Sequence, residues 1–175
     1  MQQVLASYVS PLPHKSSWAI MDDFNYFDRL RPHTKQEFCD CPSIDCLLLV
    51  YTLTDNPIHC FACKGVVDPE TISLSDEQVY RVATWHHRFR ALYDLWLDSG
   101  EYEVWAKTQL LNPTGQVNVS GLAVTSMLSE LIPTYYWWFY DEEDPVPQGC
   151  PSCHRELSAA TRHGHVQCDY CKIVI

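Results

Sequence analysis

The sequence predicts an α+β fold, in which a small core of helices and strands precedes a C-terminal zinc-ribbon β-hairpin. Three observations lead to this prediction: paired cysteines near the C-terminus, a second cysteine cluster upstream, and an aromatic strand that follows several helical segments. We expect three parts along the chain. Residues 1–36 form an N-terminal segment without a clear pattern, residues 37–144 form the α+β core with the upstream cysteines, and residues 145–175 form the ribbon.

The C-terminal cysteines have the spacing of a zinc ribbon. Each C-x2-C pair makes a tight turn that points two sulfur atoms at one ion, about 2.3 Å away. Residues 154–167 lie between the two pairs and are enough for a β-hairpin that turns near residues 161–164. His163 or His165 would replace a cysteine only in a distorted hairpin. The predicted ligands of this zinc ion are Cys150, Cys153, Cys168 and Cys171.

The upstream cluster offers five cysteines for four ligand positions. A further C-x2-C knuckle, in which Gly65 follows and suits a sharp turn, needs a second pair of ligands. Cys46 opens the apolar stretch 47–53, where a cysteine usually serves as a small buried side chain. Cys46 in place of Cys39 stays an alternative, and His59 is a minor one. The favoured ligands of the second zinc ion are Cys39, Cys41, Cys60 and Cys63.

A site of four cysteines leaves no position on the ion for water or substrate. Both predicted zinc ions are therefore structural, and each supplies on the order of 10 kcal/mol of apparent folding free energy. The sequence contains no Gly-rich phosphate loop, no nucleophile elbow and no His-Glu-x-x-His motif. We therefore expect a protein without enzymatic activity.

The clearest helix is predicted after the upstream cysteines. Ser75 and Gln78 have the spacing of a capping box, and Gly100 gives the helix an end. The apolar residues between these points recur at helical spacing. The adjacent His86 and His87 would place one ring in the core and the other in solvent, which favours a structural role for both.

Further elements follow from the same patterns. A helix with an aromatic face is predicted over residues 18–30, and two more helical segments over residues 101–111 and 120–132. The aromatic run at residues 134–140 predicts a strand that is buried on both faces. A base-stacking platform is the less favoured interpretation, because the acidic residues 141–144 follow directly and repel phosphate.

The charge of the chain disfavours nucleic acid as a partner. Lys and Arg number 12 against 22 Asp and Glu, a net charge of −10. Each four-thiolate zinc site adds about −2, whereas binding to nucleic acid depends on cations placed against phosphates. An acidic surface fits a basic protein instead. Candidate contacts are Asp141, Glu142, Glu143 and Asp144, together with Asp22 and Asp23.

The sequence also predicts where the protein works. The first residues lack the basic start and long apolar stretch of a signal peptide, and no apolar run is long enough to cross a membrane. Nine cysteines without an export signal indicate a reducing compartment and metal binding rather than disulfides. We expect a cytoplasmic protein with no membrane contact.

Four features occur together in an order that resembles a known family. They are the knuckle at residues 60–63, the helix with Trp85, the strand after Pro133, and the terminal ribbon. In residues 37–175 the chain is similar to an uncharacterised bacterial family of zinc-ribbon-containing proteins to which nucleic-acid binding has been ascribed. The resemblance implies a ribbon fold and a link to nucleic acids, and it implies no enzymatic activity.

The leading functional hypothesis is a protein-interaction module. One specific form of it is an immunity protein or antitoxin that neutralises a basic toxin, because acidic complementarity speeds association with a cationic surface. The alternative is a zinc-ribbon protein that binds nucleic acid. The basic groupings available for that role are Arg88 with Arg90, and Arg155 with Arg162 and Lys172.

Overall fold

The computed structural model describes Leu30, residues 38–158 and residues 165–175. Leu30 is fully buried in the core. The rest of the predicted N-terminal segment lies outside the described residues, and so do its helix, Asp22 and Asp23. The turn predicted at residues 161–164, which includes His163, also lies outside them.

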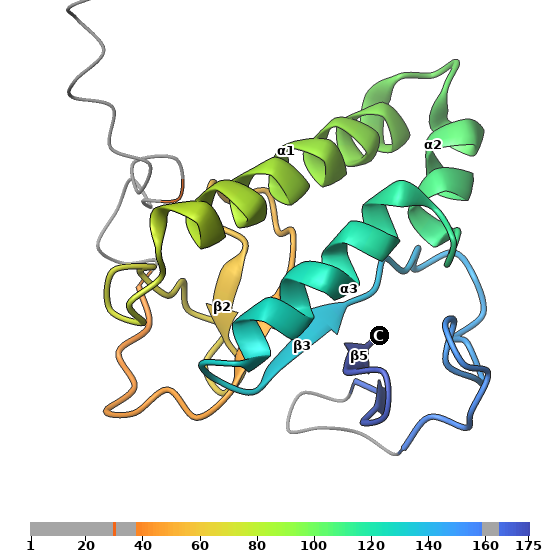
Figure 1. Ribbon diagram of the computed structural model, residues 1–175. Helices are drawn as coiled ribbons and strands as arrows, with labels where there is room; N and C mark the ends of the chain where they lie inside the picture. Colours follow the sequence, from red (N-terminus) through yellow and green to blue (C-terminus); the bar gives the residue numbers. More distant parts are fainter. Residues whose placement is uncertain (1–29, 31–37, 159–164) are drawn as a thin grey trace, which may run out of the picture.

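The strands form one five-stranded sheet whose order is β2-β1-β3-β5-β4 (Figure 1). The central strand β3 pairs in parallel with both β1 and β5, and each of these pairs with an antiparallel outer strand. Strands from both sides of the predicted boundary at residue 145 therefore join the same sheet. The strands are β1 (Leu47–Leu49), β2 (Ile58–Cys60), β3 (Thr134–Trp137), β4 (Gln167–Cys168) and β5 (Ile173–Val174).

The described residues also form three helices, so the predicted α+β class is confirmed. They are α1 (Asp76–Asp98), α2 (Glu103–Leu111) and α3 (Gln116–Ser129). The predicted capping box begins α1: Ser75 Oγ accepts from the backbone N–H of Gln78, and Gln78 Oε1 accepts from that of Ser75. His86 is buried on this helix and His87 is exposed, as the sequence predicted.

Helix α3 begins four residues earlier than the sequence predicted. Gly115, in an extended conformation, precedes its first turn. Asn118 inside that turn is buried, and its side-chain amide donates to the carbonyl oxygens of Leu110 and Asn112. Because Asn118 bonds back to the end of α2, the connection is a tight turn and the helix can start directly after it.

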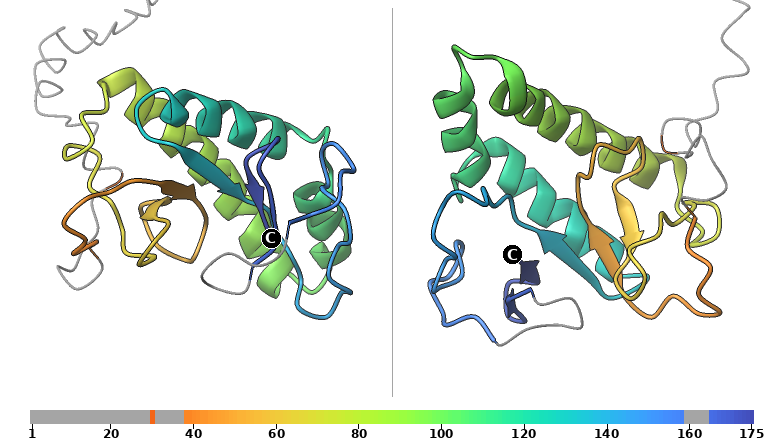
Figure 2. Two further views of the ribbon diagram at one scale, coloured as in Figure 1. Left: turned by 90° about the horizontal axis from the view of Figure 1, so that it is seen from below. Right: turned by 180° about the vertical axis from the view of Figure 1, so that it is seen from behind.

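The two long helices cover one face of the sheet (Figures 1 and 2). They come close together at Gly121 of α3. A Cβ atom there would lie 2.7 Å from Trp85 Nε1 and 2.8 Å from the ring of Tyr136. Tyr136 is fully buried and donates its hydroxyl to Asn118 Oδ1 at 2.8 Å. Only glycine therefore lets α3 pack this closely onto β3.

On the other face of the sheet, seen from behind in Figure 2, the part of the chain that the structure describes has no helix. Leu48, Val50 and Val174 are buried there beneath a thin layer of half-exposed rings. These rings are Tyr135 and Trp137 of β3 and Phe61 of the upstream knuckle. The prediction of a strand buried on both faces is therefore correct for the helix side only, since Tyr135 and Trp137 on the other side stay half-exposed.

Candidate metal centres

The upstream group consists of Cys39, Cys41, Cys60 and Cys63. Their sulfur atoms all lie within 4.8 Å of one another. The Sγ atoms of Cys39 and Cys63 are 3.4 Å apart, and those of Cys41 and Cys60 are 3.9 Å apart. The group joins a cysteine at the end of β2 to a segment nearly 20 residues earlier in the chain, so the sheet edge and the preceding loop meet at the site.

The knuckle of this group has a local hydrogen-bond pattern. The backbone N–H of Lys64 donates to the Cys60 carbonyl, and the backbone N–H of Cys60 donates to the Gly65 carbonyl, both at 2.8 Å. Lys64, with φ of 62°, is the residue that turns the chain. Gly65 serves a different purpose from the one predicted: a Cβ atom there would lie 2.8 Å from Cys39 Cα. The glycine lets the two ligand segments come together.

The C-terminal group consists of Cys150, Cys153, Cys168 and Cys171, also within 4.8 Å of one another. Its first knuckle repeats the same pattern: the backbone N–H of His154 donates to the Cys150 carbonyl at 2.8 Å, and His154 has φ of 60°. After the second knuckle, Lys172 has φ of 55°. All three C-x2-C knuckles are therefore followed by one left-handed residue that directs the chain back.

Both groups fit a tetrahedral metal ion. With metal–sulfur distances of about 2.3 Å, neighbouring sulfurs of a tetrahedron lie about 3.8 Å apart. The Sγ atoms of Cys153 and Cys168 are 3.7 Å apart, close to this value, as are the pairs of the upstream group. All nine cysteines are free of disulfides. Two such groups could therefore hold two metal ions.

Burial raises the pKa of Cys39 to about 12, and backbone amides act against this effect by favouring the thiolate form. The N–H of Gly65 donates to Cys63 Sγ at 3.3 Å, and that of Cys41 donates to Cys39 Sγ at 3.4 Å. A backbone hydrogen bond from Arg155 lowers the pKa of Cys153 to about 7. Such donors stabilise the negative charge that a metal-bound sulfur carries.

The alternative ligands among the described residues, Cys46, His59 and His165, lie outside both groups. Cys46 Sγ points at the Leu47 carbonyl, 3.7 Å away, and burial raises the pKa of this thiol to about 11. The ring nitrogens of His59 lie 2.8 Å from the Lys64 carbonyl and 3.1 Å from the Asn56 carbonyl. His165 packs on the Trp137 ring, with centroids 4.4 Å apart. The contacts of Cys46, His59 and His165 therefore favour structural roles for these side chains rather than metal binding.

Two lysines lie beside the aromatic strand: Lys64, which the sequence did not single out, and Lys172, which the sequence placed only in a basic group with Arg155 and Arg162. Lys64 Nζ lies 5.1 Å from the centroid of Trp137, and Lys172 Nζ lies 5.0 Å from that of Tyr135. Each lysine is the left-handed residue after a knuckle. In the sequence, both lysines directly follow a C-x2-C pair. This position could have identified them, because it places both side chains at the same point of two similar turns.

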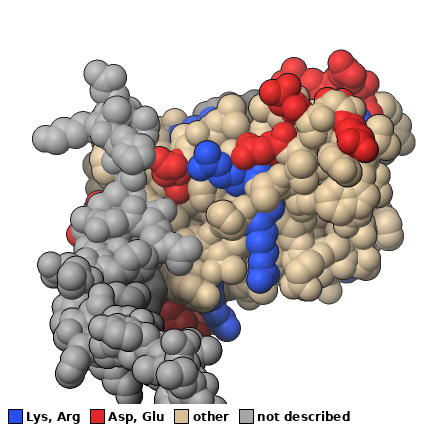
Figure 3. Space-filling view, turned by 90° about the horizontal axis from the view of Figure 1, so that it is seen from above, with Lys and Arg blue, Asp and Glu red and all other residues tan. Residues whose placement is uncertain are grey.

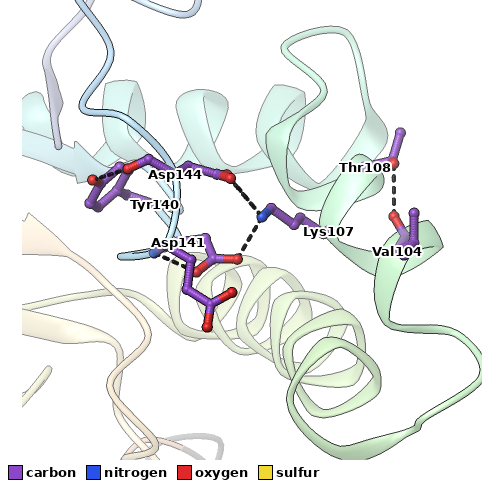
Figure 4. Close-up of polar contacts among 7 residues, drawn as sticks. Val104, Lys107, Thr108, Tyr140, Asp141 and Asp144 are labelled. Carbon is purple, nitrogen blue, oxygen red and sulfur yellow. Dashed lines mark hydrogen bonds and ion pairs between the residues drawn. The ribbon is translucent and has the colours of Figure 1, made fainter.

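Acidic side chains gather at the end of the molecule where α1 runs into α2 (Figure 3). The predicted acidic contacts at residues 141–144 are not all free to bind a partner. Lys107 Nζ lies 2.6 Å from an Asp141 oxygen and 2.9 Å from an Asp144 oxygen (Figure 4). The hydrogen bond from Lys107 lowers the pKa of Asp141. Glu142 and Glu143 are exposed.

No helix in the described part of the chain combines the length and the apolar character that a membrane span needs. A comparison of the chain with protein-family models, curated proteins and solved structures found no match. The resemblance to the zinc-ribbon-containing family stays a prediction. The fold and the two cysteine groups are therefore the basis of the functional proposal.

Proposed function

We propose that the protein is a zinc-stabilised, non-enzymatic module that binds a basic protein. The observation that carries this proposal is the pair of four-cysteine groups at the two sides of one sheet. An ion in either group has four sulfur ligands and no position left for water or substrate. Metal of this kind maintains a binding surface and takes no part in a reaction.

Zinc is the ion that the donor set favours. Four thiolates in a tetrahedron suit zinc, which has no preferred geometry of its own, and soft sulfur ligands disfavour magnesium and calcium. Because thiolate sites bind protons and metal competitively, zinc loading should weaken as the pH falls.

A basic protein partner is supported by the charge and by its distribution. The net charge is −10, and four-thiolate zinc sites make the folded protein more acidic. The exposed acidic residues at the α1–α2 end create a field that attracts a cationic surface and speeds encounter. The specific form that we propose is an immunity protein or antitoxin that neutralises a basic toxin.

The proposal is tested by isolating the partner and rebuilding the complex. The zinc-loaded protein is used to capture binding partners, and each recovered protein is purified and titrated against it by calorimetry at two salt concentrations. We expect a 1:1 complex with a protein of high isoelectric point, weakened by salt. Recovery of nucleic acid without any protein that binds after purification would contradict the proposal.

Nucleic-acid binding is kept as a second candidate because of the two lysines on the aromatic face. Lys64 and Lys172 lie over Trp137 and Tyr135, and rings flanked by cations are the usual platform for single-stranded nucleic acid. The adjacent thiolate sites oppose this role with their negative charge. Fluorescence anisotropy with a single-stranded thymidine oligonucleotide decides: salt-sensitive binding that the double variant Lys64→Ala, Lys172→Ala abolishes would favour the second candidate.

A further inference from the structure

Three adjoining hollows surround the chain where it leaves β3. Their volumes are about 480, 360 and 310 Å³. Tyr140 and Glu142 line all three, Tyr93 is shared by the first two, and Trp137 by the last two. These shared walls place the hollows next to one another, and we name the three together the β3-end groove. It runs from the α1–α2 corner to the C-terminal ribbon.

Aromatic rings form much of the walls of the groove, and its charged side chains are acidic. Its acidic lining residues are Glu103, Asp141, Glu142 and Glu143, of which Asp141 is paired with Lys107, whereas no Lys or Arg is among the lining residues that the structure describes. Lys64 lies against Trp137, where it is engaged by that ring and by His165. The aromatic wall residues are Tyr51, Phe89, Tyr93, Trp96, Trp137, Phe139 and Tyr140.

The groove is held in place before any partner arrives. Trp96 packs edge-on against Phe139 and against Tyr93, with ring centroids 4.9 and 5.1 Å apart. The hydroxyl of Tyr140 donates to the Asp144 carbonyl at 2.6 Å, and Lys107 ties the same loop to α2 (Figure 4). Fixed walls reduce the ordering cost of binding.

We propose that the β3-end groove binds an extended, Lys- or Arg-rich segment of the basic partner, an inference that rests on the proposed function. A cationic side chain in each hollow would contact the face of an aromatic ring and lie close to a carboxylate. Three hollows in a row fit successive side chains of an extended chain better than one compact ligand. The carboxylates repel phosphate, so the groove is unsuited to nucleic acid.

The test uses a fluorescein-labelled octa-arginine peptide and the zinc-loaded protein. Glu142→Gln removes one charge inside the groove, and Glu130→Gln removes one exposed charge at the end of α3, outside it. By fluorescence anisotropy at low salt, we expect Glu142→Gln to weaken binding about fivefold and Glu130→Gln less than twofold. Intrinsic tryptophan fluorescence should change on binding, since Trp96 and Trp137 line the groove.

Two results would overturn the groove. Equal weakening by the two variants would mean attraction to the overall charge and would leave the proposed function untouched. Tighter binding of octaglutamate or a thymidine oligonucleotide would mean another occupant and would count against a basic partner as well. If the purified partner binds both variants as tightly as the wild type, the module binds its partner elsewhere. If no basic protein binds the wild type at all, the proposed function itself fails. Metal content, measured for each variant, shows that the fold is intact.

Discussion

Replacing Cys63 with serine should remove one zinc ion from the protein, and replacing Cys46 with serine should remove none. Cys63 Sγ lies 3.4 Å from Cys39 Sγ inside the upstream group, whereas Cys46 points at a carbonyl oxygen outside it. A serine hydroxyl is a poor zinc ligand at neutral pH, because it stays protonated. The two substitutions are chemically identical, so their difference reports the position of the sulfur alone.

The size of the effect follows from the cysteine groups. At saturating zinc we expect two ions per wild-type chain, two in Cys46→Ser and one in Cys63→Ser. The chain has nine cysteines, and the two groups of four leave one thiol, Cys46. Since an ion contributes on the order of 10 kcal/mol of apparent folding free energy, its loss should exceed the effect of an ordinary substitution, about 1 kcal/mol.

Elemental mass spectrometry gives the zinc content, and titration with a thiol reagent gives the reactive cysteines. At pH 8 the zinc-loaded protein should expose at most one slowly reacting thiol, because burial raises the pKa of Cys46 to about 11. Chelator and denaturant together should expose all nine. The reasoning is wrong if Cys46→Ser loses an ion, or if metal-free protein unfolds with the same free energy as the zinc-loaded form.

Three further predictions concern the core and the loop after β3. Gly121→Ala should lower the free energy of unfolding in urea by about 1–3 kcal/mol, because the new Cβ clashes with two buried rings. The control substitution Ser126→Ala, at an exposed position of the same helix, should change this free energy little. Equal effects of the two substitutions would contradict the tight packing at Gly121. Burial lowers the pKa of His86 from 6.5 to about 4. The neutral ring therefore contributes about 3 kcal/mol to the free energy of unfolding, and this contribution is complete above pH 6.5 and is lost as the pH falls toward 4. His86→Gln should remove that part of the pH dependence in urea titrations, and an unchanged slope between pH 6.5 and 4 would argue against a neutral buried ring. Lys107→Met should raise the pKa of Asp141 toward its ordinary value in an NMR titration, since the lysine is what lowers it; an unaltered Asp141 titration would mean that the ion pair does not form in solution.

Local features were predictable from the sequence because their causes are local. Knuckle spacing fixes where sulfurs point, and the Ser75–Gln78 capping box determines where α1 begins. Long-range pairing was not predictable. Nothing near residues 134–137 indicates that β3 lies between the strands of two cysteine-bearing units, because that register depends on contacts with β1 and β5.

The candidate binding surface was likewise predictable only in its local features. The acidic run after β3 was visible in the sequence, but Lys107, which engages two of its four members, comes from α2, 34 residues before Asp141. Likewise, Gly65 signalled a turn, whereas its closeness to Cys39 depends on how two segments meet. Sequence patterns thus identify the chemical groups, and the tertiary fold decides which of them stay available.

The shared strand β3 has a consequence for how the protein acquires metal. Each half of the sheet hydrogen-bonds to it, and Lys64 from one half contacts His165 from the other. An ion captured by either half would order β3 and so reduce the entropy cost of assembling the opposite half. Uptake should therefore be cooperative, with singly occupied molecules scarce, and at limiting zinc the protein should be a mixture of complete and unassembled chains.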